Sequence, residues 1–464
     1  MMTFDAGATI LVIGLGKSGL ACVRVLRARG ATVYATDEKA RDHLRDAIDQ
    51  IEASGAHFIA PGELDVIVGT LTVAVLSPGV PLTSAVVLAV QRGGVPVIGE
   101  VELAYRLCKA PIIAVTGTKG KSTTTALIGH LLRECGKSVR VGGNIGNPLI
   151  DEVLDANPNE WVVAEVSSFQ LETIRAFKPH VAVLLNLAPD HLDRYHSMDE
   201  YAEAKFRIFA NQSPSDFFVG NLDDERVASL DAVKGERNVR SRQLWFTLGD
   251  RRNGATIYLQ NGAIVYAPIA GDPRPVTVMP TEEIPLAGMH NVQNVMAALL
   301  AAYAIGCETA RLREAVRTFR AMPHRLEPVD EIDGVLYVDD SKSTNPGSVI
   351  AALRAYDRPI VLIAGGRAKG TDFIEMGVAI RQRAKALVAI GEAAQEIIDA
   401  AKIEDARIAA SMSEAVGVAR QRASDGDVVL LSPGCASFDM FRSAEDRGEQ
   451  FVAAVHALRE PAGA

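Results

Sequence analysis

A glycine-rich loop with a lysine and hydroxyl groups is the part of the sequence best suited to chemistry. It reads VTGTKGKST over residues 115–123, after an apolar run and before a helical pattern. The backbone amides of such a loop bind phosphate oxygens, a lysine placed like Lys121 reaches the β- and γ-phosphates, and a hydroxyl placed like that of Ser122 binds Mg²⁺. The usual phosphate loop has a further glycine where this chain has Val115, so the motif is a shortened GxxGKST variant. We predict that the loop binds Mg-ATP.

Polar side chains follow two later apolar runs of the same region. Glu165 ends the run WVVAE and precedes Ser167 and Gln170, and the next run leads to Asp190 and His191. Because the carboxyl ends of parallel strands meet at one edge of a sheet, we expect Glu165 and His191 beside the phosphate loop. A carboxylate oxygen there suits Mg²⁺, whereas a single histidine could equally be structural.

The helical pattern MDEYAEAKFRIFA comes next. It places Tyr201, Lys205 and Ile208 on one face. Taken alone, Lys205 would be a solvated surface lysine.

A second glycine-rich turn, GLGKSG at residues 14–19, opens the chain's first helical pattern. It matches GxGxxG, in which glycines let the backbone turn tightly and approach a phosphate at a helix N-terminus. Asp37 ends the following apolar run, where a ribose-binding acid could lie. The turn fits a dinucleotide, another nucleotide, or tight packing of a helix on a strand.

The C-terminal third carries lysines, acids and hydroxyls directly after apolar runs. PHRLE at 323–327 lies where a second domain ends, and it is either a solvated linker or a phosphate contact. Asn345 and Pro346 have the residue types that start a helix. Side chains grouped at such an edge suit an anionic small molecule, although each could instead cap a loop. The candidates are His324, Arg325, Asp340, Lys342, Thr344, Lys369, Ser432, Ser437 and Phe438.

Apolar runs that alternate with helical patterns must position these side chains. That alternation predicts parallel sheets covered by helices on both faces, and 464 residues suggest about three domains. We expect α/β domains over 1–100, 101–321 and 322–464, the first and last Rossmann-like and the central one of the phosphate-loop ATPase type. Asn261–Gly262 between β-like runs predicts a hairpin, and hence a small antiparallel sheet within about 240–283.

The composition is that of a globular protein. The net charge of −9 disfavours a general nucleic-acid binder and adhesion to an anionic membrane. The five cysteines are scattered and form no CxxC pair, which disfavours a disulfide framework and favours a reducing cytosol. We find no signal-peptide pattern and no apolar run of about 18 residues, and therefore expect a cytoplasmic protein without a membrane span.

Together these motifs resemble the Mur ligases of peptidoglycan assembly over essentially the whole chain. SSFQLE, DSKSTN and SPGCASFD favour the member of the family that adds D-glutamate. The motifs that carry the resemblance are VIGLGKSG, LSPGVP, VTGTKGKST, GGNIGNP, EVSSFQLE, NLAPDHLDRY, AKFRIF, HNVQN, PHRLE, DDSKSTNP and LSPGCASFD.

The resemblance implies a role for each matching residue. UDP of the substrate UDP-N-acetylmuramoyl-L-alanine, rather than NAD, would bind Lys17, Ser18, Ser77, Pro78 and Gly79. The muramoyl-alanine part would contact Asn144, Ser167 and Gln170. D-glutamate would bind Thr344, Lys369, Ser437, Phe438 and the backbone near Ala444.

The resemblance also implies ATP and two Mg²⁺ ions in a monomeric enzyme. One ion would bind Ser122 and Glu165, and the other His191 and Lys205, with Lys205 carbamylated. Lys121, His191 and Lys205 would be catalytic. ATP would bind Gly117, Thr118, Lys119, Gly120, Lys121, Ser122, Thr123, Asn294, His324, Arg325, Asp340 and Lys342.

The sequence departs from the family pattern at three places. Lys119 replaces a frequent Asn, Ala444 a frequent Phe, and Glu38–Lys39 a Thr–Arg pair in the uridine site. The implied reaction transfers the γ-phosphoryl group of ATP to the alanyl carboxylate. The amine of D-glutamate then displaces phosphate from this acyl phosphate.

Other classes of protein stay open at this point. An NAD-dependent oxidoreductase would account for GLGKSG and Asp37 but leaves the phosphate loop unexplained. A non-enzymatic nucleotide-binding regulator has no use for the C-terminal candidates. A sibling Mur ligase or a folate polyglutamate ligase would share the central motifs but not SPGCASFD.

Overall fold

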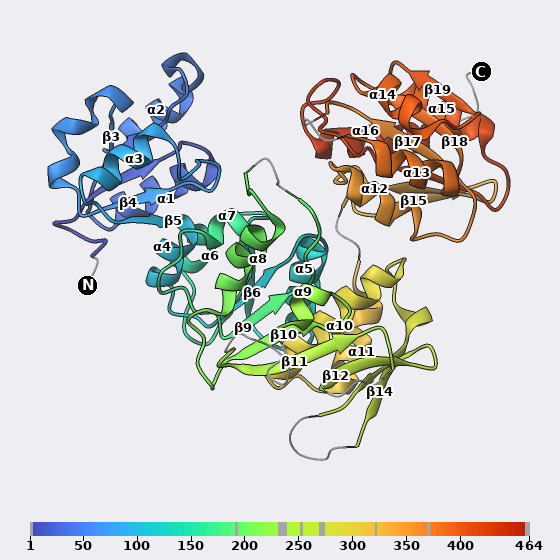
Figure 1. The fold of residues 1–464 in the computed structure, drawn as a ribbon, viewed down its shortest axis with the longest axis horizontal. Helices are drawn as coiled ribbons and strands as arrows, with labels where there is room; N and C mark the ends of the chain where they lie inside the picture. The colour runs from blue at the N-terminus through green and yellow to red at the C-terminus, as the bar shows by residue number, and fades with distance from the viewer. Residues whose placement is uncertain are drawn as a thin grey trace. The chain divides into compact units, whose positions relative to one another are not determined.

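Three mainly parallel sheets with helices packed around them form the fold (Figure 1). The computed structural model describes residues 3–190, 194–230, 239–250, 254–268, 274–320, 323–368 and 372–459. The chain divides into two compact units, one made of Met1–Thr281 with Gln293–Arg317 and the other of Glu282–Val292 with Thr318–Ala464. The predicted fold class, three α/β domains with an antiparallel element, is confirmed.

The first sheet has five strands, all parallel. Its elements are β1 (Thr9–Ile13), α1 (Lys17–Ala28), β2 (Thr32–Thr36), α2 (Arg45–Ala53), β3 (His57–Phe58), β4 (Val73–Leu76), α3 (Ala85–Arg92) and β5 (Val97–Gly99). The strand order is β3-β2-β1-β4-β5. In such a sheet ligands bind where the order reverses, outside the carboxyl ends of β1 and β4. The GLGKSG turn follows β1 and the Ser77–Pro78–Gly79 loop follows β4.

The second sheet has nine strands, with β6 near its parallel centre. Its strands are β6 (Ile112–Thr116), β7 (Val139–Gly143), β8 (Trp161–Glu165), β9 (Val181–Leu184), β10 (Phe217–Asn221), β11 (Arg242–Thr247), β12 (Ala255–Gln260), β13 (Ala263–Tyr266) and β14 (Val276–Pro280). Their order is β14-β13-β12-β11-β10-β9-β6-β8-β7. The accompanying helices are α4 (Glu100–Leu107), α5 (Lys121–Glu134), α6 (Leu149–Leu154), α7 (Ser168–Leu171), α8 (Met198–Phe206), α9 (Glu225–Ala228), α10 (Met289–Ala304) and α11 (Thr309–Thr318).

The predicted hairpin lies at one edge of this second sheet. Asn261 and Gly262 have φ angles of 51° and 73°, as a turn with two positive φ values requires. They join β12 and β13, which pair antiparallel. The antiparallel strands continue the second sheet instead of forming a separate one, because β12 also pairs parallel with β11.

The third sheet has six strands and includes one that the sequence analysis did not anticipate. Its elements are β15 (Glu327–Ile332), β16 (Val335–Asp339), α12 (Pro346–Leu353), β17 (Ile360–Gly365), α13 (Ile374–Arg383), β18 (Ala384–Ile390), α14 (Ala394–Ala401), β19 (Ala406–Ala409), α15 (Met412–Arg422), β20 (Val428–Leu431) and α16 (Ala444–Ala457). The order is β15-β16-β20-β17-β18-β19. Only β15 is antiparallel to its neighbour, and it forms a polar edge. Asn345 caps α12 and Pro346 begins it, as predicted.

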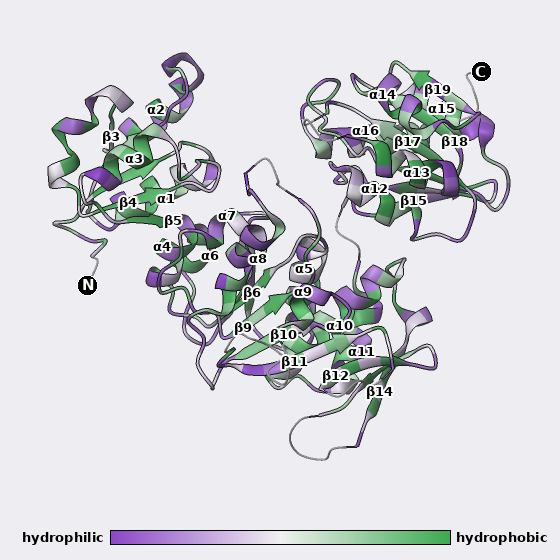
Figure 2. Ribbon diagram, viewed as in Figure 1, coloured by the Kyte–Doolittle hydropathy of each residue, from purple (hydrophilic) through white to green (hydrophobic). Residues whose placement is uncertain are grey.

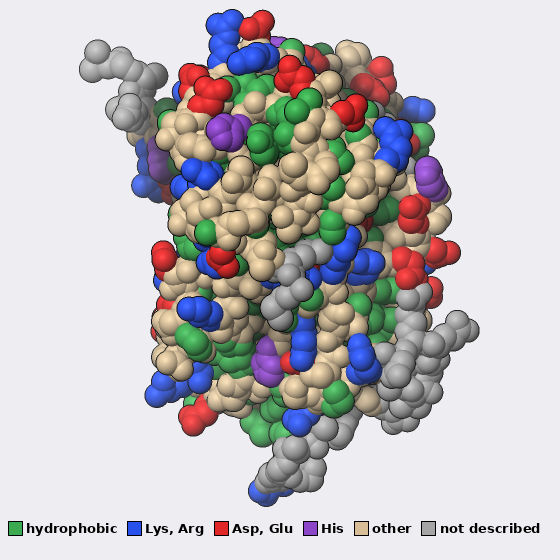
Figure 3. Space-filling model, turned by 90° about the vertical axis from the view of Figure 1, so that its left-hand side faces the viewer, with side chains coloured by type: hydrophobic (Ala, Val, Ile, Leu, Met, Phe, Trp, Pro, Cys, Tyr) green, Lys and Arg blue, Asp and Glu red, His purple; other side chains and the backbone are tan. Residues whose placement is uncertain are grey.

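Apolar strands form the interior of each sheet (Figure 2). Every residue of β6, β17 and β20 is buried, as expected for parallel strands covered on both faces. No helix in the described part of the chain is long and apolar enough to cross a membrane. Acidic and basic side chains are interspersed on the face shown in Figure 3.

Candidate active site

The phosphate loop joins β6 to α5, as predicted. Gly117 has φ 150° and Gly120 φ 83°, conformations that residues with a side chain rarely adopt. A Cβ atom on Gly120 would lie 2.2 Å from the Oδ1 atom of Asn294. The loop therefore requires its glycines, and Asn294 lies beside it, as the resemblance implies for an ATP-binding residue.

Two lysine side chains converge on one carbonyl oxygen of this loop. The Nζ atom of Lys121 donates to the oxygens of Gly117, at 3.0 Å, and Thr118, at 2.8 Å. The Nζ atom of Lys205 donates to the same Gly117 oxygen at 2.9 Å. Lysine amines that donate hydrogen bonds beside the amides of a helix N-terminus favour an anion such as a phosphate.

Lys205 is buried, in contrast to the surface position that its sequence alone suggests. Its exposed fraction is 2%, and its Nζ atom lies 4.7 Å from the centre of the Tyr201 ring. Tyr201 and Lys205 thus share one face of α8, as predicted. Burial and then the nearby Lys121 lower the pKa of Lys205 well below its usual value, against the opposing charges of Asp190 and Glu165. Lys205 therefore loses its proton more readily than an exposed lysine.

Glu165 lies beside the loop with one oxygen atom unused. In the pairing of β6 with β8 it is opposite Val115. Its Oε1 atom accepts a hydrogen bond from Asn144 at 2.7 Å, whereas Oε2 is buried with no hydrogen-bond partner among the described residues. A buried carboxylate oxygen without a donor suits a hard cation. Together with the buried Ser122 in the first turn of α5, these residues fit Mg²⁺.

Ser167 and Gln170 form a capping box at the start of α7. The amide of Ser167 donates to Oε1 of Gln170 at 2.8 Å, and the amide of Gln170 donates to the Ser167 hydroxyl at 3.3 Å. Gln170 also lines a small pocket together with Ser77 and Pro78. The structure therefore brings together residues that the resemblance assigns to two parts of one substrate.

The GLGKSG turn packs against the Ser77 loop. A Cβ atom on Gly14 would lie 2.6 Å from Val80 and 2.9 Å from Ser77, so the close approach needs glycine. Lys17 donates to the carbonyl of Gly146 at 2.7 Å. The carboxylate of Asp37 accepts the backbone amides of Leu15 and Lys39, at 2.8 and 2.9 Å. Asp37 therefore supports the turn itself, which weakens its interpretation as a ribose-binding acid.

The second unit contains a buried acidic cluster at the carboxyl end of β16. The carboxylate of Asp340 accepts hydrogen bonds from Ser343, from Ser432 at 2.8 Å and from the amide of Leu326 at 3.3 Å. Burial raises the pKa of Asp340 to about 6, although the two serine hydroxyls oppose the shift. The predicted nucleotide residue Asp340 thus also supports the fold of its own domain.

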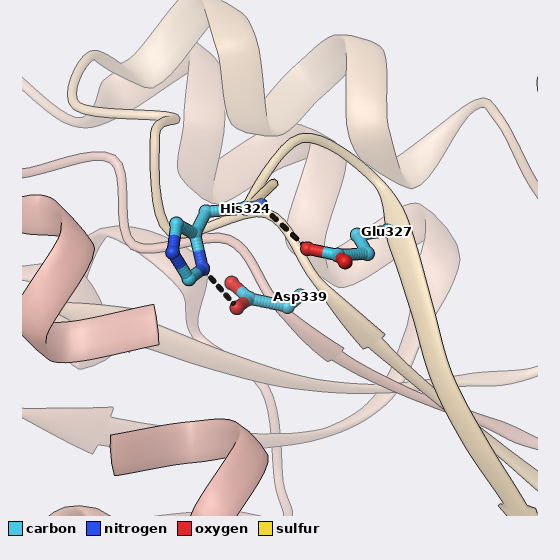
Figure 4. A group of neighbouring side chains, drawn as sticks. All are labelled: His324, Glu327 and Asp339. Carbon is cyan, nitrogen blue, oxygen red and sulfur yellow. Dashed lines mark hydrogen bonds and ion pairs between the residues drawn. The ribbon is translucent and has the colours of Figure 1, made fainter. Parts of the chain in front are cut away.

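His324 is turned toward the same strand end (Figure 4). Its Nδ1 atom lies 2.7 Å from the Oδ2 atom of Asp339, and its backbone amide donates to Glu327 at 2.7 Å. Ligand atoms of these three residues lie within 4.8 Å of one another, but the side chains already use one another and the backbone as partners. Glu327 and Asp339 were not predicted as site residues, because nothing local in PHRLE shows that this segment folds onto β16. Arg325 is half-buried beside them.

The predicted D-glutamate residues lie on loops of the same unit. Ser437 is buried, Thr344 is half-buried, and Phe438 is exposed. Lys342 pairs with Glu445, and this hydrogen bond is the main cause that lowers the pKa of Glu445 to about 2. Of the other predicted residues, Lys369 and His191 lie outside the described part of the chain.

Known proteins match the chain along almost its whole length. Residues 8–99 match the MurD-like N-terminal domain of Mur ligases, residues 115–302 the Mur ligase middle domain, and residues 324–435 the Mur ligase glutamate ligase domain. The UDP-N-acetylmuramoylalanine–D-glutamate ligase of Pelotomaculum thermopropionicum is 46% identical over 97% of this chain and 98% of that protein. The ligase of the same name from Thermoanaerobacter sp. is 42% identical over 98% of this chain and 99% of that protein.

Solved structures share the fold at lower identity. The UDP-N-acetylmuramate–alanine ligase of Thermotoga maritima has a TM-score of 0.59 and 20% identity, covering 97% of this chain and 100% of that one. The MurF ligase of Thermotoga maritima, in complex with ADP, has a TM-score of 0.59 and 16% identity, covering 92% and 96%. These neighbours support the fold alone. Because the full-length relatives are far more similar, the comparison establishes that the chain belongs to the Mur ligase family.

Proposed function

We infer that the chain is an ATP-dependent ligase that adds D-glutamate to UDP-N-acetylmuramoyl-L-alanine in peptidoglycan precursor synthesis. Its full-length similarity to ligases of that name carries this conclusion. The site agrees with it, because Lys121, Lys205 and Glu165 surround a phosphate loop. An oxidoreductase would have no use for these groups.

The reaction follows from the chemistry of a carboxylate. An amine cannot displace oxide from a carboxylate, so the γ-phosphoryl group of ATP is first transferred to the alanyl carboxylate. The amine of D-glutamate then attacks the acyl carbon, phosphate leaves, and an amide forms. Lys121 neutralises the charge that gathers on the phosphoryl oxygens, and the amides of the loop hold them in place.

We assign the binding of UDP, ATP and D-glutamate to the domains built on the first, second and third sheets. Residues 1–100 bind UDP through Lys17, Ser18 and the Ser77–Gly79 loop, and residues 101–321 bind ATP. Residues 322–464 bind D-glutamate through Thr344, Lys369, Ser437 and Phe438. The pocket that joins Ser77 to Gln170 supports the first assignment. We expect the enzyme to act as a cytoplasmic monomer.

Mg²⁺ bound at Glu165 and Ser122 would shield the negative charge of the transferred phosphoryl group. We propose a second ion held by His191 and by Lys205 in carbamylated form. The neutral amine of Lys205 attacks CO₂, one proton leaves, and the resulting carbamate presents two oxygens that share one negative charge. The burial that favours the neutral amine supports this modification.

Rescue by small acids tests the carbamate. Lys205→Ala should lose activity, and formate or acetate should restore part of it by occupying the place of the carbamate. Lys137→Ala, which removes an exposed lysine, should need no rescue. An unmodified amine in a high-resolution map of active enzyme, with no rescue of the alanine variant, would refute the proposal.

A panel of amino acids tests the function itself. Phosphate release is measured with ATP, UDP-N-acetylmuramoyl-L-alanine and single D- or L-amino acids, and we expect D-glutamate to give the fastest release. Faster release with another amino acid would point to a sibling ligase, and release with a folate substrate to a folate polyglutamate ligase. NADH is the control, and its binding would favour the oxidoreductase.

A further inference from the structure

Arg447, in the first turn of α16, has a fully buried guanidinium group. Its exposed fraction is 0%, and it makes no ion pair with a carboxylate among the described residues. Burial lowers its pKa to about 10. A cation in the first turn of a helix is also opposed by the helix dipole. Burying a cation without an ion pair costs free energy, so we expect Arg447 to have a role that offsets this cost.

The guanidinium group ties together loops that follow two separate strands. Its Nε atom donates to the Ser341 hydroxyl at 3.0 Å and its Nη2 atom to the Ser341 carbonyl at 2.8 Å. Its Nη1 atom donates to the carbonyl of Cys435 at 3.2 Å. Ser341 follows β16 and Cys435 follows β20, which are neighbours in the third sheet.

A third loop passes close to the same group. A Cβ atom on Gly366, at the end of β17, would lie 3.3 Å from Nη1 of Arg447 and 2.2 Å from the carbonyl of Ala436. Arg367 and Ala436 also exchange two backbone hydrogen bonds, of 2.9 and 3.0 Å. The three strand ends therefore meet around one side chain.

These loops carry the residues assigned above to D-glutamate. Ser341 precedes Thr344 by three positions, Cys435 precedes Ser437 by two, and Gly366 precedes Lys369 by three. Arginine suits this task because its planar group offers five donors in fixed directions, whereas lysine offers one compact charge. Nothing in the local sequence marked Arg447 as a candidate residue.

We propose that Arg447 is the positioning residue that holds these three loops in the arrangement that binds D-glutamate. The proposal rests on the proposed function, since that function defines the ligand of the loops. Arg447 does not itself contact the substrate. It acts through the backbone at Ser341 and Cys435, and so sets the distances between the groups that hold the two carboxylates of D-glutamate.

Steady-state kinetics of Arg447→Lys and Arg447→Met test the proposal. Because hydrogen bonds from a charged donor are lost, we expect the KM for D-glutamate to rise roughly tenfold to a hundredfold, and the methionine variant to be worse. The KM values for ATP and for the UDP substrate should change by less than about twofold. Hydroxylamine, which has no carboxylate, should still trap the acyl phosphate as a hydroxamate in both variants.

Val455→Ala is the matched control for lost stability. Val455 is a buried apolar residue two turns further along α16, and its side chain can make no hydrogen bond to the three loops. Thermal unfolding of all variants shows how much each is destabilised. If Val455→Ala raises the KM for D-glutamate as much at an equal loss of Tm, or if both Arg447 variants keep the wild-type KM, the proposal is wrong. If the wild type itself does not use D-glutamate, the proposed function fails instead.

Discussion

Lys121 and Lys205 share the carbonyl oxygen of Gly117, which places two like charges side by side at the phosphate loop. Burial, and then repulsion from Lys121, favour loss of the proton from Lys205, the more buried of the two. The two lysines thus share one acceptor, and burial makes Lys205 the one that loses a proton more readily.

At the scale of single residues we predict that Lys121→Met reduces turnover by roughly a hundredfold to a thousandfold, because a preorganised donor to the transferring group is lost. Phosphate release with D-glutamate is the measurement. The matched control is Lys137→Met, an exposed lysine just beyond the end of α5, which should retain normal turnover. Near-normal turnover of Lys121→Met would show that the loop is not part of the catalytic site.

The burial of Lys205 could not have been predicted from local sequence. Its helix pattern correctly placed it beside Tyr201 on one face of α8. Which face of α8 is buried depends on its contact with the loop at Gly117, which is 88 positions away from Lys205 in the chain. The same limit applies to Arg447, whose partner Ser341 is 106 positions away. The motif residues were predictable because their glycines, lysines and hydroxyls are close together in the sequence. Local backbone structure alone therefore brings them to one site.

At the scale of elements, one buried carboxyl group joins the start of α4 to the start of α6. Glu100 is 1% exposed, and its Oε1 atom accepts the amide of Ile150 at 2.7 Å. Burial is the main cause that raises its pKa from 4.5 to about 7, and Asp151 adds to the shift. The folded chain therefore keeps a proton that the unfolded chain releases between these pH values.

We predict that the contribution of Glu100 to the free energy of unfolding falls by about 3 kcal/mol as the pH rises from about 4.5 to 7. The neutral isostere Glu100→Gln lacks this titration, so its stability relative to the wild type should increase across that range. Urea unfolding at a series of pH values measures the difference. Glu134→Gln, an exposed position, should follow the wild type. Parallel curves for wild type and Glu100→Gln would contradict the prediction.

The hairpin and the strand β15 show what makes an element predictable. Asn261–Gly262 requires only two adjacent residues that accept positive φ, so its turn could be predicted from a dipeptide. Glu327–Ile332 is polar and reads as a linker, and it becomes a strand only by pairing with β16. Its hydrogen bonds, and not an apolar pattern, make it part of the sheet.

At the scale of the whole molecule, the candidate groups for the two halves of the reaction lie in different compact units. The phosphate loop belongs to the first unit and Ser437 to the second. The amine of D-glutamate must reach within bonding distance of the acyl carbon, and water must be excluded from the acyl phosphate. Binding of all substrates should therefore draw the two units together.

We predict a smaller radius of gyration when the UDP substrate and a non-hydrolysable ATP analogue are bound. Small-angle X-ray scattering of the free and the ligand-bound enzyme measures it. Lys121→Met with the same ligands tests whether phosphate binding drives the change, and it should respond less. Superimposable curves for free and fully liganded wild type would argue against such a movement.

The strand order of the third sheet has a consequence for synthesis on the ribosome. β20 lies between β16 and β17, although it is translated after both of them and after β18 and β19. A nascent chain that has reached residue 427 therefore still lacks the strand that joins the two halves of this sheet. At about 5–20 residues per second, roughly 5–20 s pass between the emergence of β16 and that of β20. During that interval the edges of β16 and β17 that later flank β20 present unpaired backbone N–H and C=O groups, so this domain is open to wrong strand pairing while it is made.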